Sequence, residues 1–397
     1  MSERRTIAIA GGGIGGLIAA LALARGGMRV LVYERAARFA PFGAGIQLSP
    51  NASRVLYAFG LGKALATAAS EPEGLIVRRG RDAQELARGP LKGFMGQRYG
   101  APYLILHRAD LHTILRVATE KEIDIDIEMG TAVADFALHK NGVTVLTERD
   151  HQLEEHRVAA LIGADGLRST VRARMFGNDQ PRPAERTAWR ALVPADQLPP
   201  EFAANNVGLW LGHDAHLVHY PLRGGSVINV VAVVADAWQA TWTGDGWNSP
   251  GDKDELAGRF SAWAPQVRDL IDSLPSVTRW ALADRKPLRR WGEGAVTLLG
   301  DAAHPMLPFL AQGGGMAIED AMTLGRCLVR GEDVAVALRK YERLRRYRTA
   351  RVQREARRMD RIYHYSNPMA ALRDMVMGAR SGQKMIERYN WLYRHKS

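Results

Sequence analysis

Cysteine and long apolar runs are both scarce in this sequence. Of its 397 residues only one is a cysteine, Cys327, so no internal disulfide can form. A chain without disulfides is typical of a reducing compartment, and we expect this one in the cytoplasm. No apolar stretch reaches the ~20 residues without glycine or charge that a membrane-spanning helix needs, so we expect no membrane span. Internal repeats and low-complexity segments are also absent.

Acidic residues are outnumbered by basic ones, and part of the imbalance is local. Lys and Arg total 54 against 42 Asp and Glu, which gives a net charge of +12. Residues 339–361 hold eleven Lys or Arg and three acids in a stretch whose pattern predicts a helix. We interpret this stretch as a solvated helix face and expect no nucleic-acid partner. A positive field also helps to attract anionic ligands.

The first strongly patterned stretch, residues 6–34, predicts a strand, a glycine turn, a helix and a second strand. Residues 6–10 are apolar and β-branched, helix-forming residues fill 17–24, and 29–33 again favour a strand. The turn carries the pattern G-x-G-x-x-G on Gly11, Gly13 and Gly16. This order is typical of a dinucleotide-binding unit.

Each part of this unit suits the binding of a pyrophosphate and a ribose. Gly11 permits a tight turn, Gly13 leaves space for the pyrophosphate, and Gly16 lets the helix pack closely on the sheet. The helix N-terminus offers free N–H groups and partial positive charge. Glu34, ~20 residues further along, can accept hydrogen bonds from ribose hydroxyls. The alternative, a glycine-rich turn in another kind of α/β protein, does not explain Glu34.

The rest of the chain predicts an α/β fold with an inserted antiparallel sheet. Residues 158–163 and 295–299 favour buried strands of the first sheet, whereas 207–211, 216–220 and 227–234 favour antiparallel strands. We therefore expect a discontinuous Rossmann-like domain, with C-terminal helices, and a substrate domain. The first takes residues 1–75, 100–175 and 295–397, and the second takes 76–99 and 176–294.

Three motifs follow one another along the chain. GGGIGG at 11–16 is followed by GADGLRSTVR at 163–172 and by GDAAHPMLPFLAQGGGMAIED at 300–320. Together with HRADL at 107–111, they closely resemble the single-component FAD-dependent aromatic monooxygenases, typified by para-hydroxybenzoate hydroxylase. The chain is most similar to the branch that contains salicylate hydroxylase, 3-hydroxybenzoate 6-hydroxylase and 6-hydroxynicotinate 3-monooxygenase. The resemblance covers nearly the whole chain.

The resemblance implies an enzyme that uses FAD, NADH or NADPH, and O2. It implies hydroxylation of a small phenolic or hydroxypyridine carboxylate, salicylate- or 3-hydroxybenzoate-like, by way of a flavin C4a-hydroperoxide. Two alternatives stay open: a hydroxylase or epoxidase of a larger aromatic or polyketide-like substrate, and a non-catalytic FAD-binding protein. We expect no metal ion, and the sequence does not decide between a monomer and a homodimer.

Cofactor-binding residues follow from the motifs and the resemblance. Arg108 is implied to contact the FAD phosphates, Asp301 the ribityl or ribose hydroxyls, and Asp165 both FAD and NAD(P)H. For Asp165 the alternative is a helix cap, and the two roles can coexist. We expect a helix to begin near Met316, so that preceding N–H groups face the negative edge of reduced flavin. The predicted set is Gly11, Gly13, Gly15, Gly16, Glu34, Arg35, Ala44, Gly45, Gln47, Arg108, Val133, Asp165, Gly300, Asp301, Gly313 and Gly314.

A base close to the substrate hydroxyl would assist oxygen transfer, because a phenolate is more electron-rich than a phenol. The predicted antiparallel strands offer His213, His216, His219 and Tyr220. On a strand, His216 and Tyr220 share one face and His219 lies on the other. The His-x-x-x-Tyr spacing resembles that of the hydroxynicotinate branch. We therefore predict that His216 and Tyr220 are catalytic and contact the substrate; the alternative is a pair of sheet residues at the solvent edge.

Gln47 and Pro305 complete the predicted substrate site. Gln47 stands where the hydroxynicotinate branch has a histidine. It can hydrogen-bond to a substrate but cannot act as a base, which weakens that substrate assignment. Pro305 and its neighbours are implied to line the ring face of the substrate, and His304 is interpreted as a structural residue that orients the loop.

Overall fold

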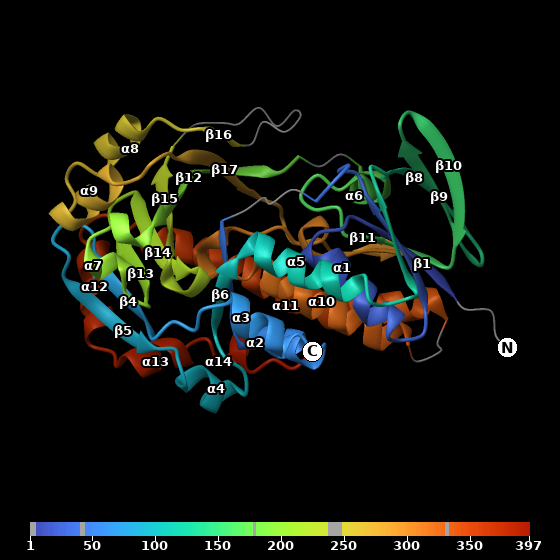
Figure 1. Ribbon diagram of the computed structural model, residues 1–397, viewed down its shortest axis with the longest axis horizontal. Coiled ribbons are helices and arrows are strands. Elements are labelled where there is room, and N and C mark those ends of the chain that lie inside the picture. The colour runs from blue at the N-terminus through green and yellow to red at the C-terminus, as the bar shows by residue number, and fades with distance from the viewer. Residues whose placement is uncertain (1–4, 40–43, 178–179, 237–247, 330–332) are drawn as a thin grey trace.

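A mostly parallel sheet forms one half of the molecule. The computed structural model describes residues 5–39, 44–177, 180–236, 248–329 and 333–397 (Figure 1). Neighbouring strands of this six-stranded sheet are parallel except at the β18–β19 edge. Its order is β18 (Gly292–Glu293), β19 (Val296–Leu298), β11 (Ala160–Gly163), β1 (Thr6–Ala10), β2 (Arg29–Glu34) and β7 (Ile125–Met129).

The strand, turn and helix at the start of the chain form as the sequence predicts. Gly11 has φ +102°, and a Cβ there would lie 2.7 Å from the carbonyl oxygen of Ala164. A Cβ on Gly16 would lie 2.0 Å from the carbonyl oxygen of Gly11, so only glycine lets the helix pack this closely. The helix α1 (Ile14–Ala24) ends before Gly27, which has φ +83°.

Helices cover one side of the parallel sheet, and a small antiparallel sheet contacts its strands β11, β1 and β2. Helix α1 packs on α10 (Gly313–Leu328) and α5 (Arg108–Thr119), and α10 packs on α11 (Val334–Tyr363) and α2 (Pro50–Ala58). The strands β8 (Ala132–His139), β9 (Gly142–Arg149) and β10 (Gln152–Val158) form a meander beside α6 (Thr170–Phe176).

Parts of the parallel sheet differ from the sequence prediction. The expected strand 158–163 is two strands, because the chain leaves β10 at Val158 and enters the parallel sheet as β11 at Ala160. The edge strand β7 was not expected from its sequence, IDIEM. Its alternating acids are tolerated because none of its residues is fully buried.

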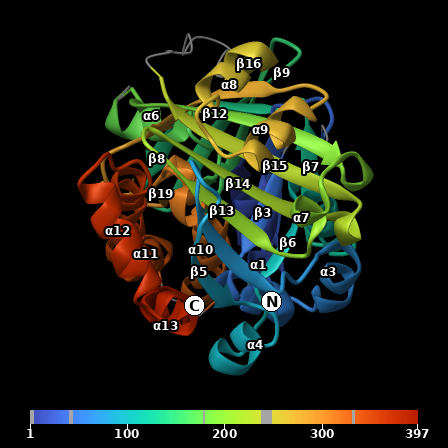
Figure 2. The same cartoon turned by 90° about the vertical axis from the view of Figure 1, so that its left-hand side faces the viewer.

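An eight-stranded sheet forms the other half of the molecule (Figure 2). Neighbouring strands are antiparallel except β13 and β4, which are parallel. One face packs in an apolar cluster with α7 (Pro200–Ala203), α8 (Lys253–Arg259) and α9 (Pro265–Asp272). The strand order is β16 (Asn248–Pro250), β17 (Thr278–Asp284), β12 (Arg182–Pro194), β15 (Val227–Ala235), β14 (Ala215–Leu222), β13 (Val207–Leu211), β4 (Gly74–Arg79) and β5 (Glu85–Pro90).

The C-terminal helices reach across to this larger sheet. Helices α12 (Met369–Gly378) and α13 (Gly382–Glu387) pack against β5, and α14 (Asn390–Tyr393) contacts α2. The expected division had placed them with the Rossmann-like domain, so the domain boundary in this stretch stays a proposal. The remaining elements are α3 (Gly62–Ala68), α4 (Phe94–Tyr99), and the antiparallel pair β3 (Gly45–Leu48) and β6 (Leu104–His107).

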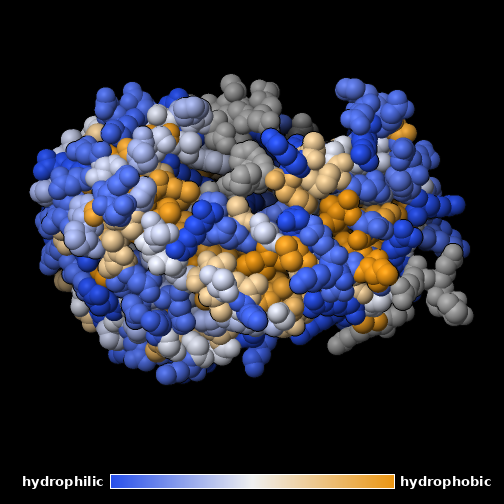
Figure 3. Space-filling view, viewed as in Figure 1, coloured by the Kyte–Doolittle hydropathy of each residue, from blue (hydrophilic) through white to orange (hydrophobic). Residues whose placement is uncertain are grey.

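Hydrophilic residues cover most of the face seen in Figure 3, with smaller apolar groups between them. Most large apolar side chains instead lie in buried clusters, one around the parallel sheet and one behind the larger sheet. Within the described residues, no helix is both long enough and apolar enough to cross a membrane.

Candidate active site

A cavity of 670 Å³ lies between the two sheets. At one end it meets the turn after β1, where Gly11 and Gly13 form part of the wall. At the other end it meets the face of the larger sheet, where His216 and Tyr220 line it. The carboxyl ends of parallel strands are the usual place for a dinucleotide in such a sheet.

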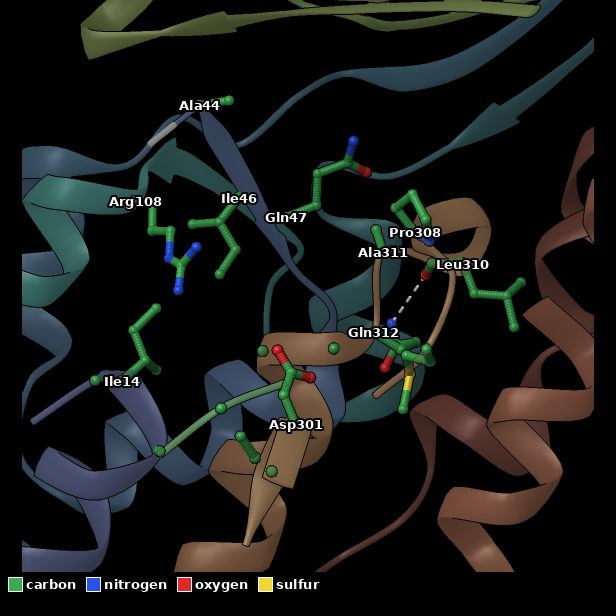
Figure 4. Close-up of a pocket in the computed structure, with 18 of the residues that line it drawn as sticks. Ile14, Ala44, Ile46, Gln47, Arg108, Asp301, Pro308, Leu310, Ala311 and Gln312 are labelled. Carbon is green, nitrogen blue, oxygen red and sulfur yellow. Dashed lines mark hydrogen bonds between the residues drawn. The ribbon is translucent and has the colours of Figure 1, made fainter. Parts of the chain in front are cut away.

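All the predicted cofactor residues line this cavity except Gly16. Gly16 faces the protein, where its missing side chain allows contact with the backbone of Gly11. Figure 4 shows Ile14, Arg108 and Asp301 around one end of the cavity, with Gln47 and Pro308 further along.

The turn after β1 is open toward the cavity. No atom of the described residues lies within 4 Å of a Cβ placed on Gly13, so the backbone there is accessible to a ligand. Glu34 is held in place by two backbone groups: the N–H of Gly12 donates to Oε2 at 2.8 Å and that of Ala36 donates to Oε1 at 2.9 Å. Its carboxylate keeps further lone pairs for a ribose.

Asp165 combines the two roles considered for it. Its Oδ2 accepts a hydrogen bond from the backbone N–H of Val171 at 3.1 Å, which caps the start of α6. Its Oδ1 is buried and has no hydrogen-bond partner in the part of the chain that the structure describes, and the same holds for Nη2 of Arg168. Burial raises the pKa of Asp165. Both residues line the cavity, so both unpaired atoms are available to a polar ligand.

Helix α10 begins at Gly313 and not near Met316, as expected from the sequence. The glycines therefore belong to its first turn, whose N–H groups have no partners within the helix. Close approach explains the glycine at 314, because a Cβ there would lie 2.8 Å from Cδ1 of Ile46. Gly313 and Gly314 line the cavity, so the positive end of the helix faces it.

Asp320 fixes the loop that carries Asp301. Its Oδ2 accepts hydrogen bonds from the N–H of Gly300 at 3.1 Å and from Nε2 of His304 at 2.5 Å. Its Oδ1 accepts a hydrogen bond from Nε of Arg345 at 2.6 Å. Burial alone would raise the pKa of Asp320, but the charges of His304 and Arg345 lower it overall. His304 is thus a structural residue, as the sequence indicated.

The basic segment 339–361 is only partly a solvated face. Arg345 is buried and bridges Asp320 and Glu319, which its Nη1 reaches at 2.6 Å. Arg348 adds two further bonds to Glu319, each of 2.7 Å. These cations were interpreted as solvated, but α10 presents two buried carboxylates to α11, and buried carboxylates require paired cations.

The strand β14 divides its side chains between the cavity and the apolar cluster behind the sheet. His216, Val218 and Tyr220 line the cavity. His219 lies on the opposite face, where its ring centroid is 4.9 Å from that of Phe202. His213, the remaining candidate, is exposed and does not line the cavity.

His216 is buried between aromatic rings. Its ring centroid lies 5.4 Å from that of Phe309 and 5.3 Å from that of Tyr363. Its Nδ1 lies 2.8 Å from Nε2 of His364. Burial, with smaller effects of His364 and Arg186, lowers the pKa of His216 well below its usual value. His216 is therefore neutral near pH 7 and can accept a proton.

Tyr220 and Gln47 meet across the cavity wall. Burial raises the pKa of Tyr220 to about 12, and a hydrogen bond with Gln47 opposes this shift. The hydroxyl of Tyr103 donates to Oε1 of Gln47 at 2.5 Å. Tyr220 therefore remains protonated at neutral pH.

Pro305 does not line the cavity, contrary to expectation. It is buried against α11, and its carbonyl oxygen accepts a hydrogen bond from Nε2 of Gln353 at 2.9 Å. Met306, Pro308 and Phe309 line the cavity instead. The loop thus lines the cavity at Asp301 and again from Met306, on either side of the buried pair His304 and Pro305.

Arg190 is a cavity residue that the sequence did not reveal. It lies on β12 opposite Val231 of β15, which in turn pairs with Val218 of β14, so its side chain joins the cavity face. Its guanidinium lies 4.9 Å from the ring centroid of Trp280, and its Nε is buried with no hydrogen-bond partner among the residues that the structure describes. Burial lowers the pKa of Arg190, which still leaves it charged. Only the register across three strands reveals its position.

Comparison with known proteins identifies the family. A family model described as an FAD binding domain matches residues 4–356. The chain belongs to this FAD-binding family. It is 40% identical over 388 residues to 3-hydroxybenzoate 6-hydroxylase 1 of Aquipseudomonas alcaligenes, which covers 98% of this chain and 97% of the relative. The resemblance seen in the sequence is confirmed.

Two further comparisons agree with this family. The chain is 35% identical over 359 residues to 6-hydroxynicotinate 3-monooxygenase of Pseudomonas fluorescens, which covers 89% of this chain and 91% of the relative. The structure of a salicylate hydroxylase substrate complex matches with a TM-score of 0.84 and 27% identity, and it covers 100% of this chain and 97% of that one. The α/β fold expected from the sequence is confirmed.

The cavity fits FAD on its own chemistry. The open backbone at Gly13 leaves room for a pyrophosphate, and the oriented Glu34 carboxylate suits a ribose. The buried Oδ1 of Asp165, which has no hydrogen-bond partner among the described residues, suits a hydroxyl donor. The first turn of α10 supplies N–H groups for an acceptor edge of the flavin.

Proposed function

We propose that this FAD-binding protein hydroxylates a small phenolic carboxylate, salicylate- or 3-hydroxybenzoate-like, with O2 and with NADH or NADPH as hydride donor. The observation that carries the proposal is the cavity face of the larger sheet. There a neutral buried histidine, a protonated tyrosine and a buried arginine, His216, Tyr220 and Arg190, all line one cavity with the predicted cofactor residues. The names of the relatives support the same substrate class.

His216 and Tyr220 would act on the substrate hydroxyl. A phenol bound at this face can give its proton to Nε2 of His216, since the ring uses Nδ1 for His364. Tyr220, whose pKa is raised to about 12, remains a hydrogen-bond donor that can orient the resulting oxygen. The increased electron density of the phenolate then favours electrophilic hydroxylation of the ring.

Arg190 would bind the carboxylate of the substrate. A guanidinium can hold a carboxylate with two parallel hydrogen bonds, and a partly desolvated one does so more strongly. We expect Arg190→Gln to raise the KM for the acid by roughly 10- to 100-fold, the loss typical of a hydrogen bond to a charged group. Arg108, at the other end of the cavity, would meet the phosphates of FAD.

FAD, when bound, supplies the redox chemistry by accepting a hydride and activating O2. The protein contributes the positive end of α10 at Gly313 and Gly314, which stabilises negative charge on the reduced cofactor. It also contributes apolar side chains of the loop, Phe309 and Leu310, which exclude water from the reacting ring.

The proposal is tested with FAD-loaded protein and a panel of acids. NADH and NADPH oxidation is followed with salicylate, 3-hydroxybenzoate and 6-hydroxynicotinate, and products are identified by mass. An acid that both stimulates oxidation and gains one oxygen supports the proposal and names the substrate. If none of the acids is hydroxylated, the proposal fails, and a larger aromatic substrate becomes the next candidate.

A further inference from the structure

A chain of hydrogen bonds leads from the cavity to the end of helix α11. Nδ1 of His216 lies 2.8 Å from Nε2 of His364, and Nδ1 of His364 lies 2.9 Å from Oδ1 of Asp360. The side chain of His364 is 1% exposed and that of Asp360 is 17% exposed. This series of hydrogen bonds therefore begins at the cavity wall and ends at a carboxylate that solvent can reach.

The carboxylate of Asp360, at the end of this series of hydrogen bonds, determines which histidine nitrogens carry a proton. An ionised Asp360 can only accept a hydrogen bond, so Nδ1 of His364 carries a hydrogen. When His364 is neutral, its other nitrogen, Nε2, is an acceptor, and His216 then donates to it through Nδ1. The remaining nitrogen of neutral His216, Nε2, therefore carries a lone pair. His216 lines the cavity, and no second hydrogen bond of its ring occurs among the described residues.

We propose that His364 and Asp360 hold His216 in the tautomer that acts as a base, and that they take up the proton lost by the substrate hydroxyl. This inference rests on the proposed function for the nature of the proton donor. The O–H bond of the phenol breaks as a bond forms to Nε2 of His216, and the Nδ1 proton of His216 passes to Nε2 of His364. The products are a phenolate, a neutral His216 and an imidazolium at His364. His364 and Asp360 contact the substrate through His216 alone, so they are positioning residues.

The charges around the pair favour this transfer. Tyr363, His364 and Asp360 face His216 from α11, and Arg186 faces it from β12. Nε of Arg186 lies 3.0 Å from Oδ1 of Asp360. A positive charge left on His216 would be buried, next to Arg186 and one residue away from the carboxylate. Moved to His364, the same charge is in direct contact with Asp360, which stabilises it.

The tautomers can be measured without any substrate. Protein loaded with FAD and labelled with 15N at histidine is examined by NMR, and the signals of His216 are assigned with His216→Gln. We expect the native protein to show a proton on Nδ1 and none on Nε2 of His216 near pH 7. A proton on Nε2 of His216 in the native protein would overturn the proposal.

The proton transfer is tested with bound 3-hydroxybenzoate, whose phenolate has its own ultraviolet absorption. We expect Asp360→Asn to raise the apparent pKa of the bound phenol and to lower kcat about 10- to 100-fold, as for outer partners of functional histidines, with KM changed much less. Asp360→Glu should restore most of both. The matched control is His219→Gln, a buried histidine on the other face of β14, which should change neither.

The outcomes separate this inference from the proposed function. If Asp360→Asn folds and binds the acid but leaves the phenol titration and the pH profile of kcat unchanged, the proposal is wrong. If native protein neither binds nor hydroxylates 3-hydroxybenzoate, the proposed function fails for that acid. The NMR measurement of the His216 tautomer still tests the role of His364 and Asp360 in that case.

Discussion

The loop between β19 and α10 and the cavity face of the larger sheet bury polar groups in opposite ways. Beside the loop, Asp320 of α10 accepts hydrogen bonds from a backbone N–H, a histidine and an arginine. On the sheet, Nε of Arg190 is buried with no hydrogen-bond partner within the described ranges, and Arg190 lines the cavity. Paired buried groups hold a shape, whereas unpaired ones cost free energy unless a ligand pairs them. The loop is thus a scaffold, and the sheet face is prepared for a ligand.

Two buried histidines show the same difference. His304 contacts Asp320 directly, with Nε2 2.5 Å from the carboxylate, and does not line the cavity. His216 reaches a carboxylate only through His364, and it lines the cavity. A histidine paired directly with a buried carboxylate anchors the backbone. One that reaches its carboxylate through a second ring lies at the cavity, where its other nitrogen is available to a ligand.

The largest effect is expected where the scaffold loses a paired charge. Arg345→Leu leaves Glu319 and Asp320 buried with one cation fewer, and breaking such a pair typically costs about 3–5 kcal/mol. Chemical denaturation measures the free energy of unfolding. The control is Arg343→Leu, an exposed position on the same helix, for which we expect a change within ~0.5 kcal/mol. Equal effects of the two variants would show that the ion pairs do not hold the loop.

The next largest effect is expected at the cavity face of the larger sheet. His216→Gln should lower kcat by roughly 10²-fold or more, the usual contribution of a general base, while the protein retains its stability and FAD. His219→Gln, on the opposite face of the same strand, should leave kcat unchanged. Steady-state kinetics with the acid identified in the panel provides the measurement. A similar loss of kcat in both variants would mean that the two histidines matter only for the packing of β14, and that His216 does not act as a base.

Two glycines of one motif are expected to have different roles, one in packing and one in cofactor binding. A Cβ on Gly16 would lie 2.0 Å from the carbonyl oxygen of Gly11, whereas a Cβ on Gly13 would meet no atom within 4 Å. We expect Gly16→Ala to destabilise the protein by about 1–3 kcal/mol, as overpacking does. Gly13→Ala should preserve the melting temperature of the FAD-free protein and weaken FAD binding. FAD titration by fluorescence, beside thermal unfolding, distinguishes the two. The contrast is lost if Gly13→Ala binds FAD as well as the native protein does.

Local patterns predicted the parts of the molecule that depend on neighbouring residues. The turn after β1 follows from the spacing of three glycines and Glu34. The placement of His216 and Tyr220 on one face of β14 follows from the alternation of side chains along a strand. The start of α10 was missed because a run of glycines usually favours a loop. In this protein the missing side chains permit close approach to Ile46.

Contacts between distant segments could not be predicted from the sequence. His216 and His364 are 148 residues apart, and their hydrogen bond depends on how α11 returns to the sheet. Arg190 reaches the cavity face through the register of β12, β15 and β14. The arginines of α11 looked solvated because their carboxylate partners lie on another helix. The sequence shows where charged residues stand along the chain, but their ion-pair partners follow only from the fold.

The smallest effect concerns the dependence of stability on pH. The charges of His304 and Arg345 hold the pKa of Asp320 below its usual range, so the unfolded chain binds this proton more readily than the folded protein. The stabilisation is therefore complete above the unfolded pKa of ~3.9 and is lost as the pH falls through the lower folded value. In Asp320→Asn, the rise of unfolding free energy with pH across this range should be smaller, by up to about one proton. Denaturation at several pH values between neutral and acidic provides the measurement. An unchanged slope would mean that folding does not lower the pKa of Asp320, and that the charges of His304 and Arg345 do not stabilise its ionised form.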